Sequence, residues 1–399
     1  MTVWDELVGQ RQLVADLRVA VEGAARALGG AASSAMTHAW LFTGPPGSGR
    51  SNAARSFAAA LLCDEGGCGE CLACRTALSG AHADVTVVIS EQSVLKVDPM
   101  RELVRQAALA PSGGRWQVFI VEDADRLNDK AADALLKSLE EPPPRTVWLL
   151  CAPTVEDVLP TIRSRCRTKV LRTPPSDEVA AHLVRSSNVT EAVAAYAARA
   201  SQGHIGRARA LALDEPTRNR RREVLRIPSQ LLDLGSCMTC AANVLEAATE
   251  EGEPRAAALD AAELSDLETA YGAGGRGPRS AAFSAAVKEL QRNHRQRTKR
   301  FVRDALDRSL LDLASFYRDV VAVQLGAGRR LVNEEQRAEV ESVARRTTGE
   351  VSAARLAAIF ATREALEAEV APALALESLM ISLADGGYAQ SARSLTAAT

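Results

Sequence analysis

Residues Gly44 to Ser51 read GPPGSGRS, and this stretch decides the fold. It follows the apolar run Ala39 to Phe42 and precedes the alanine-rich segment Asn52 to Leu62. A strand that enters a glycine-rich turn and then a helix directs backbone N–H groups and the helix dipole at one point, which is how proteins hold phosphate. The template G-x-x-x-x-G-K-[ST] fits everywhere except Arg50, where a planar guanidinium replaces a compact ammonium. The predicted phosphate-binding residues are Gly44, Pro45, Pro46, Gly47, Ser48, Gly49, Arg50 and Ser51.

Length and composition describe a multidomain globular chain. With 399 residues, the chain is too long for one ordinary core and predicts two or three domains. Its formal net charge of −2 gives no global attraction to nucleic acid, so any such contact would be local. The polar N-terminus and the lack of a long apolar run favour a cytoplasmic protein without a membrane span. Eight cysteines in that compartment indicate metal ligands or buried thiols rather than disulfides.

Short apolar strands alternate with helical segments through the first half of the chain. Besides Ala39 to Thr43, the expected strands are Asp84 to Ile89, Trp116 to Val121 and Val147 to Cys151. Such an alternation is typical of a parallel sheet with helices on both faces.

Four cysteines lie within twelve residues at the spacing C-x4-C-x2-C-x2-C. Thiolates this close in sequence can reach the corners of one tetrahedron, as a structural zinc site requires, and four of them leave no open position for catalysis. Four buried thiols are the alternative, but a glycine-rich excursion offers no core in which to bury them. The predicted zinc ligands are Cys63, Cys68, Cys71 and Cys74. Cys237 and Cys240 lack a second pair, and a packed helix is the better interpretation there.

The strand Val118 to Val121 ends in Glu122 and Asp123. In a P-loop nucleotidase, an acid at such a strand end holds Mg²⁺ beside the phosphates. Here the glutamate precedes the aspartate, the reverse of the usual order, so Mg²⁺ binding is left open. The alternative is that these acids, and Asp125, cap the next helix.

Several segments together resemble the bacterial clamp-loader branch of the AAA+ ATPases. They are Thr37 to Phe42, the glycine-rich loop, the four-cysteine module, Ala134 to Pro143 and Ser164-Arg165-Cys166. The resemblance covers residues 1 to about 212. It implies an α/β P-loop AAA+ core in residues 1–173, a small three-helix lid in 174–213 and an all-α collar domain in 214–399.

Within that branch, the γ/τ ATPase motor of DNA polymerase III competes with a stator-like relative that completes the ring. Arg50, the reversed acids and Ala152-Pro153 at the place of a polar phosphate sensor all indicate a degenerate ATP site. Gly206 stands where a further sensor arginine is expected, although Arg207 is adjacent. These departures favour the stator, in which ATP or ADP could bind without hydrolysis and the chain alone would have no ATPase activity.

The motif Ser164-Arg165-Cys166 is intact. By resemblance, Arg165 would be an arginine finger, which stabilises the charge on a γ-phosphoryl group in the ATP site of a neighbouring γ/τ subunit. A surface arginine without this role is the alternative.

The resemblance also implies partners. These are the γ/τ and δ subunits of a heteropentameric loader, the β sliding clamp and primer-template DNA contacted through its backbone. The DNA-facing helix N-termini would be Asp98 to Arg101 and Asn128 to Lys130. A P-loop kinase acting on a small molecule is a further alternative, but it leaves the cysteine module and Arg165 unexplained.

The second half of the chain is rich in Ala, Leu, Glu and Arg and is predicted to be helical, with an interruption at Gly272 to Gly277. Its densest basic run is expected to cover more than one helix face, which favours a solvated or intersubunit surface over direct DNA contact. The run comprises Lys288, Arg292, Arg295, Arg297, Lys299, Arg300 and Arg303.

Overall fold

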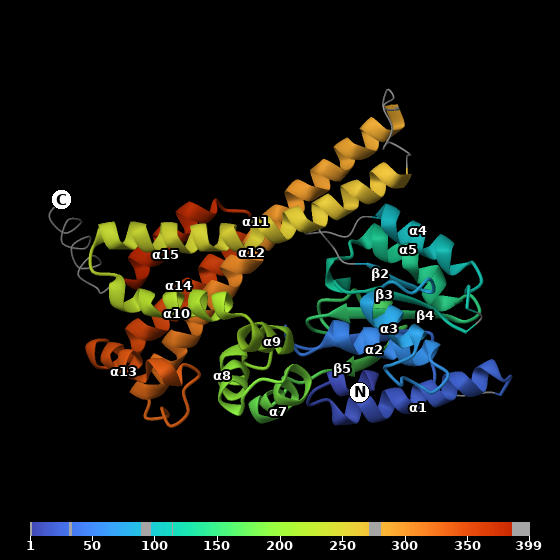
Figure 1. Cartoon of the computed structure of the whole chain (residues 1–399), viewed down its shortest axis with the longest axis horizontal. Coiled ribbons are helices and arrows are strands. Elements are labelled where there is room, and N and C mark those ends of the chain that lie inside the picture. The colour runs from blue at the N-terminus through green and yellow to red at the C-terminus, as the bar shows by residue number, and fades with distance from the viewer. Residues whose placement is uncertain (1, 32–33, 89–96, 114, 271–280, 385–399) are drawn as a thin grey trace. The chain divides into compact units, whose positions relative to one another are not determined.

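The computed structural model describes the chain except for residues 1, 32–33, 89–96, 114, 271–280 and 385–399. The chain divides into two units, Met1–Leu213 and Asp214–Thr399 (Figure 1). No described helix combines the length and the apolar composition that a membrane crossing requires.

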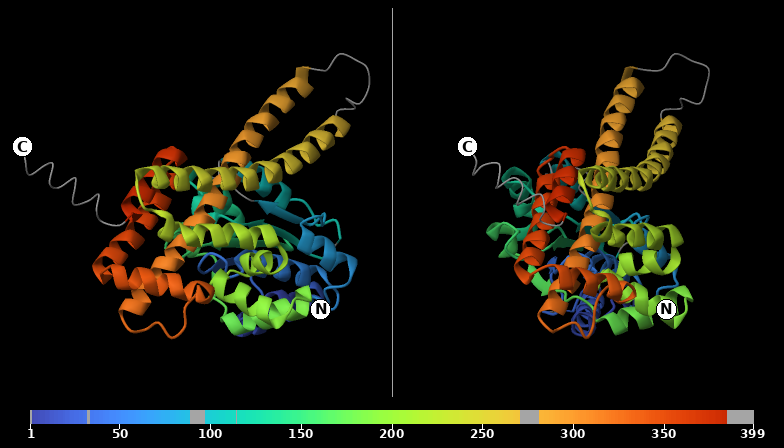
Figure 2. Two further views of the ribbon diagram at one scale, coloured as in Figure 1. Left: turned by 60° about the vertical axis from the view of Figure 1, so that its left-hand side comes forward. Right: turned by 90° about the vertical axis from the view of Figure 1, so that its left-hand side faces the viewer.

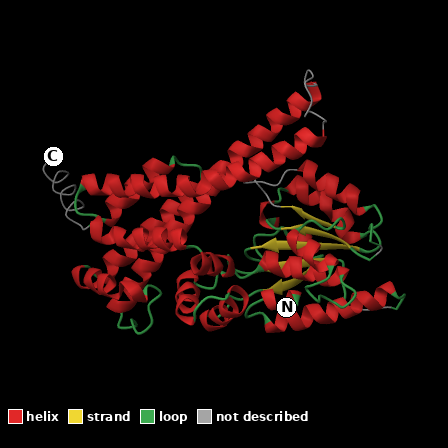
Figure 3. Cartoon of the chain, viewed as in Figure 1, coloured by secondary structure: helices red, strands yellow, loops and turns green. Residues whose placement is uncertain are grey.

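Unit 1 contains a five-stranded parallel sheet with the strand order β2-β3-β4-β1-β5 (Figure 3). The first and fourth strands are buried along their whole length, which accounts for their continuous apolar sequence. The predicted strands are therefore confirmed, except that Ile89 lies outside the described residues. The strands are β1 (Ala39–Thr43), β2 (Val85–Val88), β3 (Gln117–Val121), β4 (Thr146–Ala152) and β5 (Arg167–Val170).

Helices cover both faces of this sheet, as predicted. Trp40 and Phe42 of β1 belong to one apolar cluster, which includes residues of α1 (Arg11–Leu28), α2 (Arg50–Leu62) and α3 (Leu72–Ser79). The intervening residue Leu41 belongs to the cluster on the other face, because successive side chains of a strand point in opposite directions. The helices contributing to that second cluster are α4 (Val97–Ala107), α5 (Asp129–Glu140) and α6 (Pro160–Arg163). Short 3₁₀ segments are η1 (Val3–Glu6) and η2 (Ala124–Arg126).

Three short helices complete unit 1 and share their own apolar cluster. They are α7 (Ser176–Ser187), α8 (Glu191–Ser201) and α9 (Ile205–Leu213). The three helices are present as predicted, and α7 begins at Ser176, directly after Pro175. The cap of α8 is Thr190, whose side chain accepts a hydrogen bond from the backbone N–H of Val193.

Unit 2 is helical and packs around a single apolar cluster. A buried polar network ties its helices together, in which the Arg221 guanidinium donates to Asp312 at 2.9 Å and the Asn333 amide donates to Asp319 at 2.8 Å. The predicted interruption at Gly272 to Gly277 lies outside the described residues. The elements are α10 (Glu215–Gln230), α11 (Leu234–Ala270), α12 (Ala281–Gln324), η3 (Glu334–Gln336), α13 (Arg337–Arg346), α14 (Gly349–Glu367) and α15 (Pro372–Leu383).

Candidate phosphate loop and metal centre

The predicted phosphate-loop residues meet at one edge of the sheet. Strand β1 lies between β4 and β5, and the loop 44–51 follows its carboxyl end. Glu122 follows β3 and Pro153 follows β4 at the same edge, since the strands are parallel. The backbone N–H of Gly44 donates to the Pro153 carbonyl at 3.0 Å, which joins the loop to the end of β4.

Three glycines give the loop its shape. Gly44, Gly47 and Gly49 have φ values of +152°, +81° and +95°. A Cβ at Gly44 would lie 2.6 Å from the Leu171 carbonyl oxygen, so a larger residue does not fit there. Because α2 begins at Arg50, the N–H groups of its first turn have no acceptor within the helix and remain available to an anion.

Three buried polar atoms in or beside the loop have no hydrogen-bond partner among the residues that the structure describes. They are Thr43 Oγ1, Ser48 Oγ and Arg50 Nη1. Two hydroxyl groups and a cation next to a helix N-terminus match the hydrogen-bond demands of a phosphate group. A phosphate therefore fits this loop.

Glu122 is already paired in this fold. Its carboxylate accepts a hydrogen bond from Ser51 Oγ at 3.0 Å and forms an ion pair with Arg55 Nη2 at 2.8 Å. Both charged side chains are largely buried, with 21% of Arg55 and 16% of Glu122 exposed. The guanidinium supplies the positive charge that a Mg²⁺ ion would bring to this carboxylate, so Mg²⁺ does not fit unless Arg55 moves away. Sequence reasoning missed Arg55, although its place one helical turn after Ser51 was a usable signal.

Two further acids, Asp123 and Asp125, follow β3. Asp123 precedes η2 and makes no side-chain capping bond, so the capping interpretation is not supported for it. Burial raises the pKa of Asp125, and the Asp123 charge adds to the rise while Arg126 and Arg50 oppose it. These acids and Arg50 thus share one electrostatic environment.

His204 lies against the loop, which sequence reasoning also missed. A Cβ on Gly47 would come within 2.4 Å of the imidazole Cγ. The ring is held by its Nδ1, which accepts a hydrogen bond from the Arg207 N–H at 3.2 Å. A Cβ on Gly206, the predicted sensor position, would lie 3.5 Å from the same ring. The start of α9 therefore adjoins the phosphate loop.

Gln10 ties the N-terminal segment to the loop. Its buried amide nitrogen donates to the Arg172 carbonyl at 2.6 Å and approaches the Ser48 carbonyl at 3.4 Å. The backbone N–H of Arg172 donates back to Gln10 Oε1 at 3.2 Å. These contacts fix the loop relative to the exit of β5.

Arg165 lies at the amino-terminal end of the parallel strands, whereas the phosphate loop lies at their carboxyl end. It precedes β5, and the pair Trp40 and Arg167 marks the start of the β1–β5 ladder. Gly44 follows Trp40 by four residues, so the two sites are separated by about 13 Å or more along the strands.

The Arg165 side chain is held within the chain. Its Nη1 donates to the Thr161 carbonyl at 2.7 Å and to Ser164 Oγ at 3.2 Å, and its Nη2 pairs with Glu140. One third of the side chain is exposed. Burial raises the pKa of the neighbouring Cys166 thiol to about 12, so that thiol stays protonated at neutral pH.

The four module cysteines converge. Their sulfur atoms all lie within 4.8 Å of one another, and Cys63 Sγ is 3.7 Å from Cys68 Sγ and 3.8 Å from Cys71 Sγ. Zinc–sulfur bonds of about 2.3 Å in a tetrahedron place the sulfurs about 3.8 Å apart. Burial alone would raise the pKa of Cys63, but backbone N–H groups outweigh it and lower the pKa to about 7. The donor set therefore fits zinc.

One premise of the sequence argument for this module is wrong. Cys63 and Cys74 are buried and belong to the apolar cluster beneath α2, so the excursion does have a core. The reason is that η1 packs on the module, where a Cβ on Gly67 would lie 2.6 Å from Val3 Cγ2. The Trp4 indole N–H also donates to the Gly66 carbonyl at 3.2 Å.

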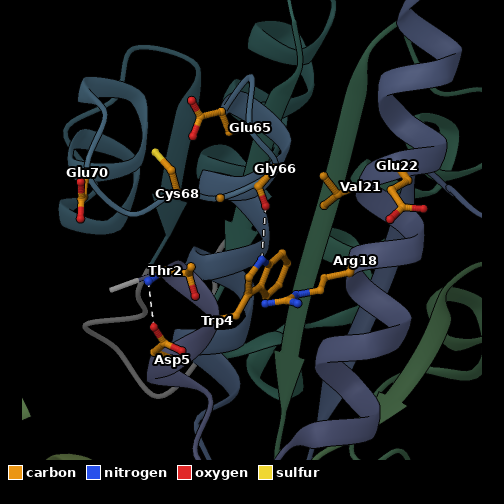
Figure 4. A pocket seen from close by; sticks show the side chains of 11 residues that line it. Thr2, Trp4, Asp5, Arg18, Val21, Glu22, Glu65, Gly66, Cys68 and Glu70 are labelled. Carbon is orange, nitrogen blue, oxygen red and sulfur yellow. Dashed lines mark hydrogen bonds between the residues drawn. The ribbon is translucent and has the colours of Figure 1, made fainter. Parts of the chain in front are cut away.

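A cavity of about 650 Å³ adjoins the module (Figure 4). The Trp4 ring forms one wall, with the Arg18 guanidinium 5.9 Å from its centroid. The other lining residues come from the N-terminal segment, α1 and the module; the acidic ones are Asp5, Glu22, Glu65 and Glu70. Figure 4 shows these side chains around the opening.

The two helix N-termini predicted to face DNA both exist. Asp98 and Arg101 lie in the first turns of α4 and form an exposed ion pair of 3.7 Å. Asn128 caps α5, with its side chain accepting from the Ala131 N–H at 2.9 Å. DNA contact at these termini stays a prediction.

Part of the chain is similar to known proteins. Residues 26–175 match the family model described as "DNA polymerase III, delta subunit". The chain is 43% identical over 145 residues to DNA polymerase III subunit delta′ of Pseudomonas aeruginosa, covering 35% of this chain and 44% of that protein. It is 35% identical over 180 residues to subunit delta′ of Escherichia coli, covering 44% of this chain and 54% of that protein. Subunit gamma/tau of Mycobacterium bovis is 36% identical over 185 residues, covering 45% of this chain and 30% of that protein. The chain thus spans about half or less of the length of these relatives.

Proposed function

We propose that the chain is a member of the DNA polymerase III clamp-loader family, which its residues 26–175 resemble, and that it acts as the stator-like δ′ subunit. In this role it helps load the β sliding clamp onto primed DNA, together with γ/τ and δ subunits. It contributes an arginine to a neighbour's ATP site and does not hydrolyse ATP itself.

The observation that carries this proposal is the pairing of Glu122 with Arg55. A hydrolytic ATP site uses Mg²⁺ to neutralise charge that develops on the phosphates. Here the acid expected to hold that ion is neutralised by a guanidinium, and Arg50 replaces the loop lysine. Both changes support a loop that binds nucleotide phosphate statically.

The position of Arg165 supports action on a neighbour. Arg165 lies at the amino-terminal end of the strands, opposite the carboxyl end that carries the chain's own phosphate loop. It therefore cannot contact a phosphate in that loop without refolding the β1–β5 pair. Its guanidinium is partly exposed, and Glu140 orients it. In a ring of subunits, such an arginine would complete the ATP site of the adjacent γ/τ subunit.

The test is Arg165→Ala in a loader reconstituted from γ/τ, δ and this chain. We expect ATP hydrolysis stimulated by DNA and clamp to fall by about tenfold or more, because removal of a finger in trans leaves transition-state charge unbalanced. Assembly, measured by size-exclusion chromatography, should be unchanged. The matched control is Arg163→Ala, which removes a nearby arginine of α6. Full turnover in the Arg165 variant would overturn the finger assignment.

We also propose that the four cysteines hold a structural zinc ion. The sulfur spacing and the packing of η1 on the module support this. The zinc would fix the excursion between α2 and α3 and would leave no open coordination position.

A γ/τ-like motor is the second candidate, since γ/τ relatives match this chain over a similar length. Purified chain alone separates the two. A motor would hydrolyse ATP measurably in Mg²⁺, whereas the stator would give no release of phosphate above a protein-free blank.

A further inference from the structure

Helices α11 and α12 form a long antiparallel hairpin in unit 2 (Figures 1 and 2). The apolar cluster of this unit includes α11 only up to Ala248 and α12 only from Ala305. The remaining residues, 252–270 and 281–303, form what we call the arm. The arm begins at Gly252, where the backbones of α11 and α12 are in close contact, since a Cβ on Gly252 would lie 2.7 Å from the Val302 nitrogen.

The inner side of the arm is held by an ionic cluster. Arg297 is 6% exposed, and its guanidinium contacts Asp260 at 2.8 Å and Glu263 at 2.7 Å. His294 Nε2 lies 3.2 Å from the second Glu263 oxygen. Asp260 and Glu263 of α11 are therefore engaged by Arg297 and His294 of α12.

The structure separates the other cations of the basic run onto a different face. We call this the cationic face; its members are Lys288, Arg292, Arg295, Lys299 and Arg303. They recur at intervals of four, three, four and four residues, which places them within an arc of about 80° and leaves Arg297 on the opposite side. The first four are exposed, and the face is about 22 Å long. The expectation that the run covers more than one face is correct, but five of its seven members share a single face.

The chemistry of this face favours a polyanion over a protein surface. The exposed residues interspersed with the cations are polar, namely Ser284, Gln291 and Gln296. Among the described residues between 281 and 303, no large hydrophobic side chain is exposed. Protein interfaces centre on apolar and aromatic residues and are depleted in lysine, whereas a line of Lys and Arg is the usual footprint of a nucleic-acid backbone.

We propose that the cationic face of the arm binds the phosphodiester backbone of nucleic acid. The formal net charge of −2 means that the whole chain does not attract DNA, so the affinity must come from a local patch. Binding of this kind is independent of base sequence and weakens steeply with salt. It involves neither the phosphate loop nor Arg165, and it holds whether or not the proposed loader function does.

The experiment measures binding of the full-length chain to a fluorescein-labelled DNA duplex by anisotropy at several salt concentrations. In the test variant Lys288, Arg292, Arg295 and Lys299 are all changed to Gln. We expect its affinity to fall by about tenfold or more, and the slope of log K against log salt to become shallower by about 3 to 4, since each lost phosphate contact contributes about 0.9.

Two further variants keep the proposal falsifiable. The control changes Arg222, Arg329, Arg330 and Arg345 to Gln, which removes the same charge from exposed positions elsewhere in unit 2, and should bind nearly as well as the parent. The double variant Arg292→Lys and Arg295→Lys should retain binding, because phosphate contact requires charge more than shape. The proposal is overturned if the parent does not bind, if test and control variants lose affinity equally, or if the test variant binds DNA normally and fails only to assemble with partner subunits.

Discussion

Two arginines on α2 change what the phosphate loop can do. Arg50 occupies the place of the loop lysine and keeps one buried nitrogen, Nη1, without a partner. Arg55 forms an ion pair with Glu122 instead. Arg50 leaves a site for an anion, whereas the Arg55–Glu122 pair removes the site for a metal ion. Phosphate binding and ATP hydrolysis are therefore separate properties of this loop.

The Arg55 pair predicts how the chain responds to Mg²⁺. Millimolar MgCl₂ should leave the melting temperature of the parent chain within about 1 °C of an ionic-strength-matched NaCl control, because Glu122 is already neutralised. Arg55→Met keeps much of the aliphatic stem but leaves a largely buried carboxylate unpaired, which should lower the free energy of unfolding by about 1–3 kcal/mol. Mg²⁺ should then restore part of this loss in the variant.

Differential scanning fluorimetry across a MgCl₂ titration makes the measurement. A parent chain that is stabilised by Mg²⁺ as strongly as the variant would contradict the assignment, because Arg55 would then not exclude the ion.

At the residue scale, sequence identified the loop and both acids but not their partners. Arg55 reaches Glu122 across 67 positions of sequence, and His204, which lies far from Gly47 in sequence, packs against it. Such contacts depend on tertiary packing, which no local spacing encodes. The location of Arg165 at the amino-terminal end of the strands likewise needed the strand order.

The cysteine module behaves as an element of its own, built between α2 and α3. Gly66, Gly67 and Gly69 adopt positive φ values of 68°, 109° and 85°, which turn the chain tightly enough for the sulfurs to converge. The backbone N–H of Cys71 donates to Cys68 Sγ, and that of Cys74 donates to Cys71 Sγ, both at 3.4 Å. These two hydrogen bonds fix the positions of the Cys68 and Cys71 sulfur atoms within the module.

We predict about one equivalent of zinc in the purified chain. Cys68→Ser combined with Cys71→Ser should release it and lower the melting temperature by about 5 °C or more, since binding energy of a structural metal is folding energy. Elemental analysis and thermal denaturation provide the two readouts. Cys237→Ala, outside the module, should keep the metal; a double variant that also keeps it would refute the four-thiolate site.

Elements were predictable where one face or both faces of a segment are apolar. The strands β1 and β4 show this, because full burial requires continuous apolar sequence. Helix starts were less predictable. Helix α5 already begins at Asp129, where Asn128 caps it, upstream of the Ala134 to Pro143 motif, and α11 runs without a break through 37 residues. In α11, pairing with α12 rather than its own periodicity sets the length.

At the scale of the whole molecule, the chain holds separate cores. Three apolar clusters belong to residues before Asp214, and one belongs to residues after it. No described cluster includes residues of both units. Cooperative unfolding follows shared cores, so each unit should unfold as a unit of its own.

This division predicts two thermal transitions in calorimetry of the full chain. A zinc chelator should lower only one of them, because the cysteine module lies in unit 1 and packs on its core. Asp312→Ala, which leaves the buried Arg221 guanidinium without its carboxylate, should lower only the other, by about 3–5 kcal/mol in unfolding free energy. If instead both perturbations shift a single transition by equal amounts, the two units share one cooperative core, and the effect of zinc on stability would extend to unit 2.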